Sequence, residues 1–235
     1  MSGKPHMEDR LKQPNSRHLV AADLRGLIEQ MPPIVFNEEV LPDIRSNFGI
    51  PIEFDEDEKA VEQIKSERLA VPGRAGDPDV AIALHLPRAV NPNRGAILHI
   101  HGGGYVAGDA FSTIPIHRKM ALDLDCVIAS VDYRLAPETR FPGAIEDCYA
   151  VLRWLDDQAA ELGIDTGSIG VMGESAGGGL AASLALLVRD RSEHCLAFQH
   201  LVYPMIDDRT CIAPEPNAFA GEFIWTPEST RFGWS

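Results

Sequence analysis

The chain has 235 residues, 45% hydrophobic and 24% charged, which is the composition of one well-buried globular domain. Its 21 Lys and Arg against 35 Asp and Glu give a formal net charge of −14. That balance argues against a nucleic acid or an anionic membrane as partner, because phosphates require a basic surface. The four cysteines have no zinc or CxxC spacing, residues 1–18 are too polar for a signal peptide, and no apolar run could span a bilayer. We therefore expect a cytoplasmic protein with reduced thiols and no metal.

The first part of the chain predicts helices with interruptions. Asn15 or Ser16 can cap a helix whose apolar residues recur at helical spacing, and Pro32-Pro33 ends it. The acidic stretch Asp55 to Glu58 is expected to be a solvated loop.

From residue 60 the pattern changes to strands alternating with helices. Apolar and polar residues alternate over 61–69 and 80–86, as in half-buried strands. Nearly continuous apolar runs, typical of strands buried on both faces, cover 95–100, 126–131 and 168–172, and a weaker one covers 198–203. Helical segments cover 114–124, 144–162 and 175–191. This order predicts a doubly wound, mostly parallel α/β sheet, with reactive residues at the carboxyl ends of its strands.

The first chemical motif is Gly173-Glu174-Ser175-Ala176-Gly177, placed after a buried strand and before a helix. A G-x-S-x-G in this position is a nucleophile elbow, a strained turn that lifts the serine above the sheet. The flanking glycines prevent collisions, and the helix directs free N–H groups at a developing oxyanion. The alternative is a tight glycine-rich turn with an idle serine.

The second motif is His101-Gly102-Gly103-Gly104-Tyr105, directly after the strand predicted over 95–100. Such a loop supplies N–H donors to the tetrahedral oxyanion of ester hydrolysis. A phosphate-cradling loop is disfavoured, because neither a Walker motif nor a dinucleotide-binding motif occurs. Since oxyanion donors do the electrostatic work, no cofactor is implied.

The segments HGGGYVAGD (101–109), DYRLAPETRFPGAIEDC (132–148) and GESAGGGLAA (173–182) resemble the hormone-sensitive-lipase-like family of bacterial carboxylesterases. The resemblance implies an α/β-hydrolase fold with cap helices over residues 1–50 and a core over residues 51–235. It also implies hydrolysis of small esters with short acyl chains. In the family, aspartate is common at the position of Glu174.

The resemblance also implies residue roles. Ser175 matches the nucleophile, and His101 with Gly102 matches positions that shape the oxyanion loop. Arg134 is expected to pair with a buried carboxylate, for which Glu146 and Asp147 are candidates, although a solvated helix face is an alternative for both. The backbone N–H groups that match the oxyanion hole belong to Gly103, Gly104 and Ala176.

The chain departs from the family after Ser175. A triad needs an acid and then a histidine, but the only later histidines are His194, expected at the end of a helix, and His200, expected inside a strand. Asp207 and Asp208 follow that strand and are possible neighbours of the site. The family's later Asp-Pro-Leu segment and histidine loop are missing. We expect a C-terminally truncated chain without the triad acid and base, weakly active or inactive.

Three alternatives stay open. His101 is a substitute candidate for the base. The chain could instead be a non-catalytic hydrolase-fold protein that binds ligands, or an interaction protein that works through its acidic surface.

With the last strands missing, the strand over 198–203 is expected to form an unprotected edge, through which the chain forms homo-oligomers or aggregates.

Overall fold

The computed structural model describes residues 16–31, 33, 35–47, 56–211, 217 and 219–235. These residues group into two units, Leu41–Ile206 and a second unit made of Met1–Val40 with Asp207–Ser235. The expected boundary between cap helices and core near residue 50 stays a prediction. Asn15, Pro32 and Asp55, named above for a cap, a helix end and a loop, lie outside the described residues.

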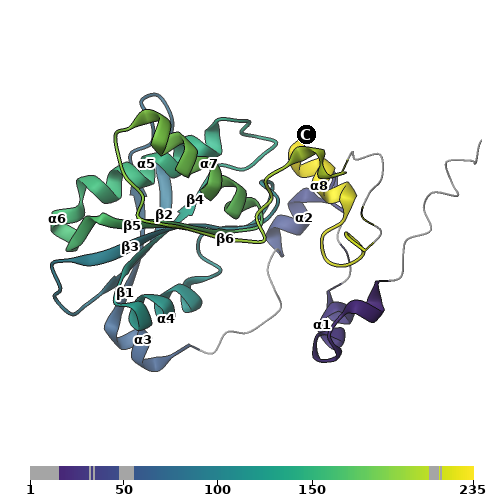
Figure 1. Ribbon diagram of the computed structural model, residues 1–235, viewed down its shortest axis with the longest axis horizontal. Helices are drawn as coiled ribbons and strands as arrows, with labels where there is room; N and C mark the ends of the chain where they lie inside the picture. Colours follow the sequence, from purple (N-terminus) through teal and green to yellow (C-terminus); the bar gives the residue numbers. More distant parts are fainter. Residues whose placement is uncertain (1–15, 32, 34, 48–55, 212–216, 218) are drawn as a thin grey trace, which may run out of the picture. The chain divides into compact units, whose positions relative to one another are not determined.

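A six-stranded sheet organises the unit Leu41–Ile206, in the order β1-β2-β4-β3-β5-β6 (Figure 1). β3, β4, β5 and β6 run parallel, whereas β2 pairs antiparallel with both β1 and β4. The mostly parallel α/β sheet predicted from the sequence is therefore confirmed. The strands are β1 (Ile64–Val71), β2 (Val80–Pro87), β3 (Arg94–Ile100), β4 (Val127–Asp132), β5 (Ile164–Glu174) and β6 (Gln199–Val202).

Helices cover both faces of this sheet. α3 (Glu58–Gln63) and α4 (Ile114–Leu124) lie on one face, and α5 (Gly143–Asp157), α6 (Ala159–Leu162) and α7 (Ala176–Arg191) lie on the other (Figure 1). α2 (Leu41–Ser46) precedes them in the chain. The second unit contains α1 (Arg25–Gln30) and α8 (Pro227–Trp234), with single 3₁₀ turns at Arg17–Leu19, Ala22–Leu24 and Asp208–Cys211.

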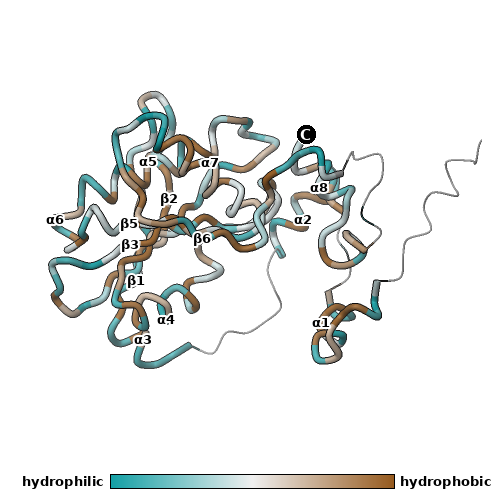
Figure 2. The backbone as a smooth tube through the Cα atoms, in the orientation of Figure 1, coloured by the Kyte–Doolittle hydropathy of each residue, from teal (hydrophilic) through white to brown (hydrophobic). Residues whose placement is uncertain are grey.

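The core consists of two apolar layers, one on each face, and the strands stand out as hydrophobic in Figure 2. Successive side chains of a strand point to opposite faces, so Leu98 joins the layer under α5 and α7 while Ile97 joins the layer under α4. Cys126 and Cys148 are buried, one in each layer, as expected for small hydrophobic residues.

The entry into β1 differs from the prediction. Residues 61–63 belong to α3 and not to a strand, and β1 begins at Ile64. The carboxylate of Asp57 accepts a hydrogen bond from the Ala60 N–H at 3.1 Å and so caps α3. The prediction of a solvated loop through Glu58 was therefore wrong, because this acidic stretch contains a helix start.

Ser16 also differs from its predicted role. Its side chain does not cap the following 3₁₀ turn, and it is hydrogen-bonded to the carboxylate of Glu222 in the same unit. Both residues belong to the second unit, so this contact joins two segments of it that are far apart in the sequence. The local sequence identifies Ser16 as a possible capping residue. Its actual hydrogen-bond partner, Glu222, is distant in the sequence and is brought near by the tertiary structure.

Arg134 anchors the segment that follows β4. Its guanidinium donates to Asp147, whose side chain is 1% exposed, at 2.7 Å, and lies 3.3 Å from the carboxylate of Asp77. Glu146 is also buried, and it pairs with Arg191. Asp147 is therefore the predicted partner of Arg134, and the alternative of a solvated helix face is wrong for both carboxylates.

Candidate active site

Ser175 lies on the turn between β5 and α7, at the carboxyl end of the strand. Its backbone has φ 54° and ψ −118°, a conformation that is strained for a residue with a side chain. A Cβ atom at Gly173 would lie 2.3 Å from the carbonyl oxygen of Gly177, and one at Gly177 would lie 2.0 Å from that of Ile100. Both motif glycines are therefore required by the close approach of neighbouring backbone.

The backbone of Ser175 is held on both sides. Its N–H donates to the carbonyl of Val202 at 2.9 Å, and its carbonyl accepts from the N–H of Met205 at 2.8 Å. The Tyr105 hydroxyl donates to the carbonyl of Met205 at 2.7 Å. The end of β6 and the loop that follows it thus fix the strained turn.

The glycine loop lies against this turn. A Cβ atom at Gly102 would stand 3.4 Å from the Cβ of Ser175. Gly103 has φ 120°, and a Cβ there would lie 2.0 Å from the carbonyl oxygen of Ala107. Within the described residues, the N–H groups of Gly103 and Gly104 donate no hydrogen bond. Ala176 is the first residue of α7, where N–H groups have no partner inside the helix.

Glu174 connects the elbow to the glycine loop, a role that the sequence reasoning missed. Its Oε1 accepts from the Gly102 N–H at 2.8 Å, and its Oε2 accepts from Nε2–H of His99 at 3.0 Å. His99 Nδ1 in turn is hydrogen-bonded to the hydroxyl of Ser130 at 2.7 Å. Burial alone would raise the pKa of Glu174, but the hydrogen bonds from His99 and Gly102 hold it below its usual value. The one feature of the sequence that pointed to this contact was His99, a histidine inside the apolar run of residues 95–100.

His101 is enclosed by the loop that it begins. Its ring stacks on Tyr133 with centroids 4.2 Å apart, its Nδ1–H donates to the carbonyl of Gly102 at 2.7 Å, and only 3% of the residue is exposed. Burial lowers the pKa of His101 to about 4, so the ring is neutral at pH 7. Its Nε2 is buried and has no hydrogen-bond partner among the described residues.

The remaining candidates for a base or an acid have other partners or positions. His194 lies just beyond the end of α7 and its Nδ1 is hydrogen-bonded to the carboxylate of Asp156 at 3.1 Å, while His200 is exposed on β6. Asp207 is paired with Arg209 at 2.7 Å, and the hydrogen bond from Arg209 lowers the pKa of Asp207 to about 2. Among the described residues, no histidine is hydrogen-bonded to Ser175.

Two further classes of site are absent from the described part of the chain. It contains no cluster of three or more histidine, cysteine or acidic side chains that could hold a metal ion. None of its helices has the length and apolar character needed to cross a membrane.

Comparison with known proteins adds independent information. Residues 97–235 match the family model of the α/β-hydrolase fold. Carboxylesterase NlhH of Mycobacterium tuberculosis is 41% identical over 132 residues, which cover 56% of this chain and 41% of NlhH. An arylesterase of Saccharolobus solfataricus is 45% identical over 98 residues, covering 42% of this chain and 32% of that protein.

Solved structures agree with the sequence relatives. A bacterial heroin esterase superposes with a TM-score of 0.81 at 33% identity, covering 94% of this chain and 69% of that one. The hyperthermophilic esterase of Pyrobaculum calidifontis superposes with a TM-score of 0.70 at 27% identity, covering 92% and 69%. The chain thus spans about two fifths of the curated carboxylesterase and about two thirds of these structures. The chain belongs to the α/β-hydrolase family, in its hormone-sensitive-lipase-like branch of bacterial carboxylesterases.

Proposed function

We propose that this protein hydrolyses small carboxylic esters with short acyl chains through an acyl-enzyme at Ser175. The observation that carries the proposal is the strained Ser175 turn packed against a glycine loop whose Gly103 and Gly104 N–H groups have no acceptor among the described residues. The names of the relatives, carboxylesterase and arylesterase among them, support the same reaction class.

In the proposed reaction, Ser175 Oγ attacks the ester carbonyl carbon and its proton passes to a general base. The carbonyl oxygen becomes an oxyanion that accepts hydrogen bonds from the N–H groups of Gly103, Gly104 and Ala176, each donor contributing about 3–4 kcal/mol to the transition state. Collapse expels the alcohol, which takes up the proton, and water then attacks the acyl-enzyme to release the acid and free Ser175.

The base and its orienting acid are not assigned to any described residue around Ser175. We therefore expect the 235-residue chain by itself to turn over slowly, since loss of triad members costs about 10⁴–10⁶ in kcat. An extended chain, carrying the C-terminal segment of NlhH after Ser235, is expected to gain activity on p-nitrophenyl acetate and butyrate.

The test is Ser175→Ala in that extended chain. The substitution should abolish the gained activity, whereas Ser183→Ala on α7 should retain it, because the Ser183 hydroxyl is bonded to the Gly179 carbonyl of its own helix at 2.9 Å. If Ser175→Ala kept most of the rate, the nucleophile assignment would be wrong. If the extended chain bound esters without hydrolysing them, the non-catalytic alternative would replace the proposal.

A further inference from the structure

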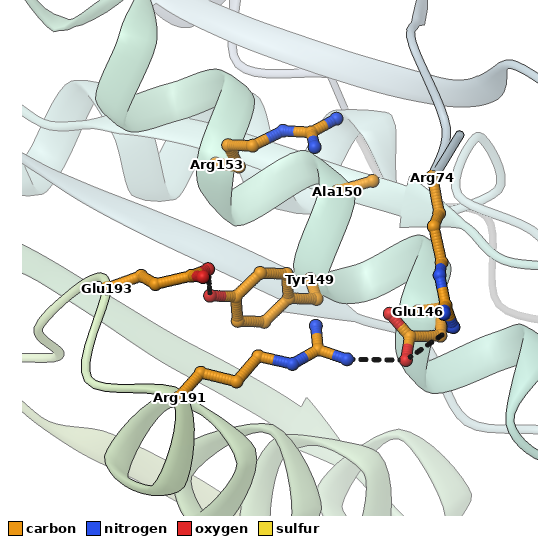
Figure 3. A pocket seen from close by; sticks show the side chains of 7 residues that line it. All are labelled: Arg74, Glu146, Tyr149, Ala150, Arg153, Arg191 and Glu193. Atoms are coloured by element: carbon orange, nitrogen blue, oxygen red, sulfur yellow. Dashed lines mark hydrogen bonds and ion pairs between the residues drawn. The ribbon is translucent and has the colours of Figure 1, made fainter.

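A second polar site lies far from Ser175. A pocket of about 250 Å³ opens between α5, the turn that joins β1 to β2, and the end of α7 (Figure 3). α7 starts beside Ser175 and has 16 residues, so Arg191 lies about 22 Å along the helix from its first residue. The polar side chains that line the pocket are Arg74, Arg153, Arg191, Glu146, Glu193 and Tyr149.

The charges of this pocket do not balance. Glu146 accepts from Arg191 at 2.6 Å and from Arg74 at 3.3 Å, so two arginines share one carboxylate. The Glu193 carboxylate accepts instead from the hydroxyl of Tyr149 at 2.5 Å. Arg153 has no carboxylate partner among the described residues. The lining of the pocket thus contains three guanidinium groups and two carboxylates, an excess of one positive charge in a chain whose net charge is −14.

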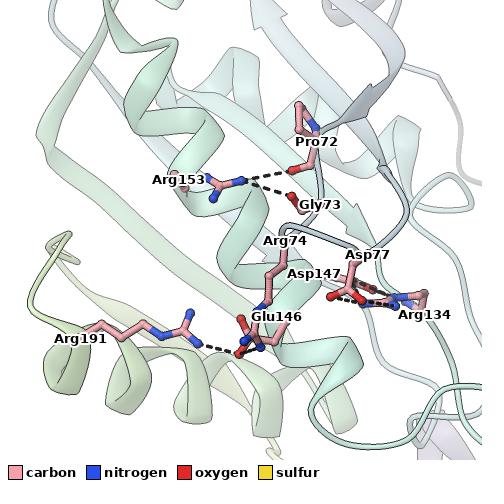
Figure 4. A network of polar contacts seen from close by, with 9 residues as sticks. All are labelled: Pro72, Gly73, Arg74, Asp77, Arg134, Glu146, Asp147, Arg153 and Arg191. Carbon is pink, nitrogen blue, oxygen red and sulfur yellow. Dashed lines mark hydrogen bonds and ion pairs between the residues drawn. The ribbon is translucent and has the colours of Figure 1, made fainter.

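Arg153 is the least satisfied of the three arginines. Its Nη2 approaches only the backbone carbonyls of Pro72 and Gly73, at 3.5 and 3.4 Å (Figure 4). These distances are at the outer limit for N–H···O hydrogen bonds. An anion in the pocket would therefore offer Arg153 an ionised acceptor at a shorter distance than these two carbonyls.

The other two arginines also have contacts around the pocket, closer for Arg191 than for Arg74, whose side chain is 59% exposed. The guanidinium of Arg191 lies over the ring of Tyr149, 4.2 Å from its centroid, while its other contact is Glu146. Arg74 belongs to the β1–β2 turn, which the ion pair of Arg134 with Asp77 fixes to the segment after β4 (Figure 4). Cations held by packing and by ion pairs lose less conformational entropy on binding an anion.

We propose that this pocket binds a small phosphate-bearing molecule, with Arg153 as its principal ligand and Arg74 and Arg191 beside it. Planar guanidinium groups match the oxygens of phosphate in pairs, and the negative charge of a phosphate offsets the single excess positive charge of the pocket. The volume lies below the range of about 300–1,000 Å³ that is usual for drug-sized ligands, so the occupant is small. Glu193 adds a negative charge that disfavours polyanions.

The experiment is a titration of inorganic phosphate followed by ³¹P line broadening, at low protein concentration and at ionic strength held constant with NaCl. A second titration uses glycerol 3-phosphate. The probe that binds more tightly shows whether the pocket prefers free phosphate or a phosphate ester. We expect saturable broadening with a millimolar dissociation constant for at least one probe. Arg153→Gln should weaken that binding at least fivefold.

The matched control is Arg189→Gln, which removes the same charge from the exposed end of α7. Arg189 pairs with Asp190 and does not line the pocket, so binding should stay within twofold of the unmodified chain. Line broadening that does not saturate would overturn the proposal. So would an equal reduction of the broadening by Arg153→Gln and Arg189→Gln. If circular dichroism shows that Arg153→Gln does not fold, Arg153→Lys replaces it. Lysine keeps the charge but lacks the paired N–H donors of the planar guanidinium, so binding should again weaken at least fivefold. None of these readouts depends on ester hydrolysis.

Discussion

At the scale of single residues, the side chain next to the expected nucleophile links two motifs. Glu174 follows Gly173 in the elbow, yet its carboxylate holds the N–H of Gly102 in the glycine loop and Nε2–H of His99 on β3. A carboxylate can accept both hydrogen bonds at once, whereas an amide offers one oxygen and one NH₂ group. The proposed oxyanion donors begin one residue after Gly102, so their position depends on this contact.

Replacing Glu174 with glutamine is therefore expected to lower kcat of the extended chain by about 10–100-fold, less than the loss of a whole oxyanion donor. KM should change little, because the substitution disturbs transition-state contacts and not ester binding. The matched variant Glu174→Asp keeps the charge and should retain more of the rate than glutamine does. Steady-state kinetics on p-nitrophenyl butyrate would measure both, and an unchanged kcat in Glu174→Gln would refute the positioning role.

At the scale of secondary-structure elements, three histidines form a layer between the sheet and α4. The ring of His117 on α4 lies 4.1 Å from that of His99 on β3 and 5.7 Å from that of His85 on β2, centroid to centroid. His85 is hydrogen-bonded to the Ser66 hydroxyl at 2.9 Å. Burial, with the charge of Arg118 nearby, lowers the pKa of His85 to about 4, and burial lowers that of His117 well below its usual value.

These lowered pKa values predict acid sensitivity. In the unfolded chain His85 and His117 take up protons below about pH 6.5, while the folded chain excludes those protons. The free energy of unfolding should therefore fall as the pH drops from about 6.5 to 4, with a slope of up to about 1.4 kcal/mol per pH unit for each such histidine. Urea unfolding at several pH values measures this slope.

Two variants test whether the histidines between the sheet and α4 cause this dependence of the unfolding free energy on pH. His85→Gln removes one titrating group and should flatten the slope by about one proton, whereas His200→Gln, at an exposed position on β6, should leave it unchanged. Equal slopes in the His85→Gln variant and the unmodified chain would show that this layer does not control acid stability.

At the scale of the whole molecule, β6 is the outermost strand of the sheet on its side. Among the described residues it pairs with β5 only, and its sequence QHLV contains no formal charge. Tyr203 directly after it is 74% exposed, and Phe198 directly before it is 45% exposed. Edges without charge, proline or a covering segment invite pairing with another chain.

We predict that the isolated 235-residue chain self-associates through this edge and is marginally stable. His200→Lys, which places a charge on β6, should shift the chain towards monomer in size-exclusion chromatography. The control Val90→Lys adds the same charge at a position that is 98% exposed in the β2–β3 loop, and should leave association unchanged. A monomer that melts cooperatively above about 60 °C without any substitution would contradict the prediction.

Local chemistry made much of this fold predictable from the sequence alone. The helix Ile114–Leu124 begins and ends where its periodicity predicts, and β3, β4 and β5 lie within a few residues of the apolar runs. The run over 198–203 also forms a strand, but the prediction that it is buried on both faces was wrong, because β6 is exposed to half-buried. The elbow at Ser175 was equally readable, because its glycines are demanded by backbone contacts among residues close to it in the sequence or in the next strand. Such patterns depend on each residue and its near neighbours, which the sequence displays directly.

Tertiary structure alone decided the rest. His99 and Glu174 are 75 positions apart, and they meet because β3 and β5 are adjacent in the sheet. Arg191 and Glu146 meet because α5 and α7 cover the same face, while Arg153, also on α5, has no carboxylate partner among the described residues. Buried polar groups take whichever partner the packing of distant elements brings within hydrogen-bonding distance, so their pairing follows from the assembled fold and not from local propensity.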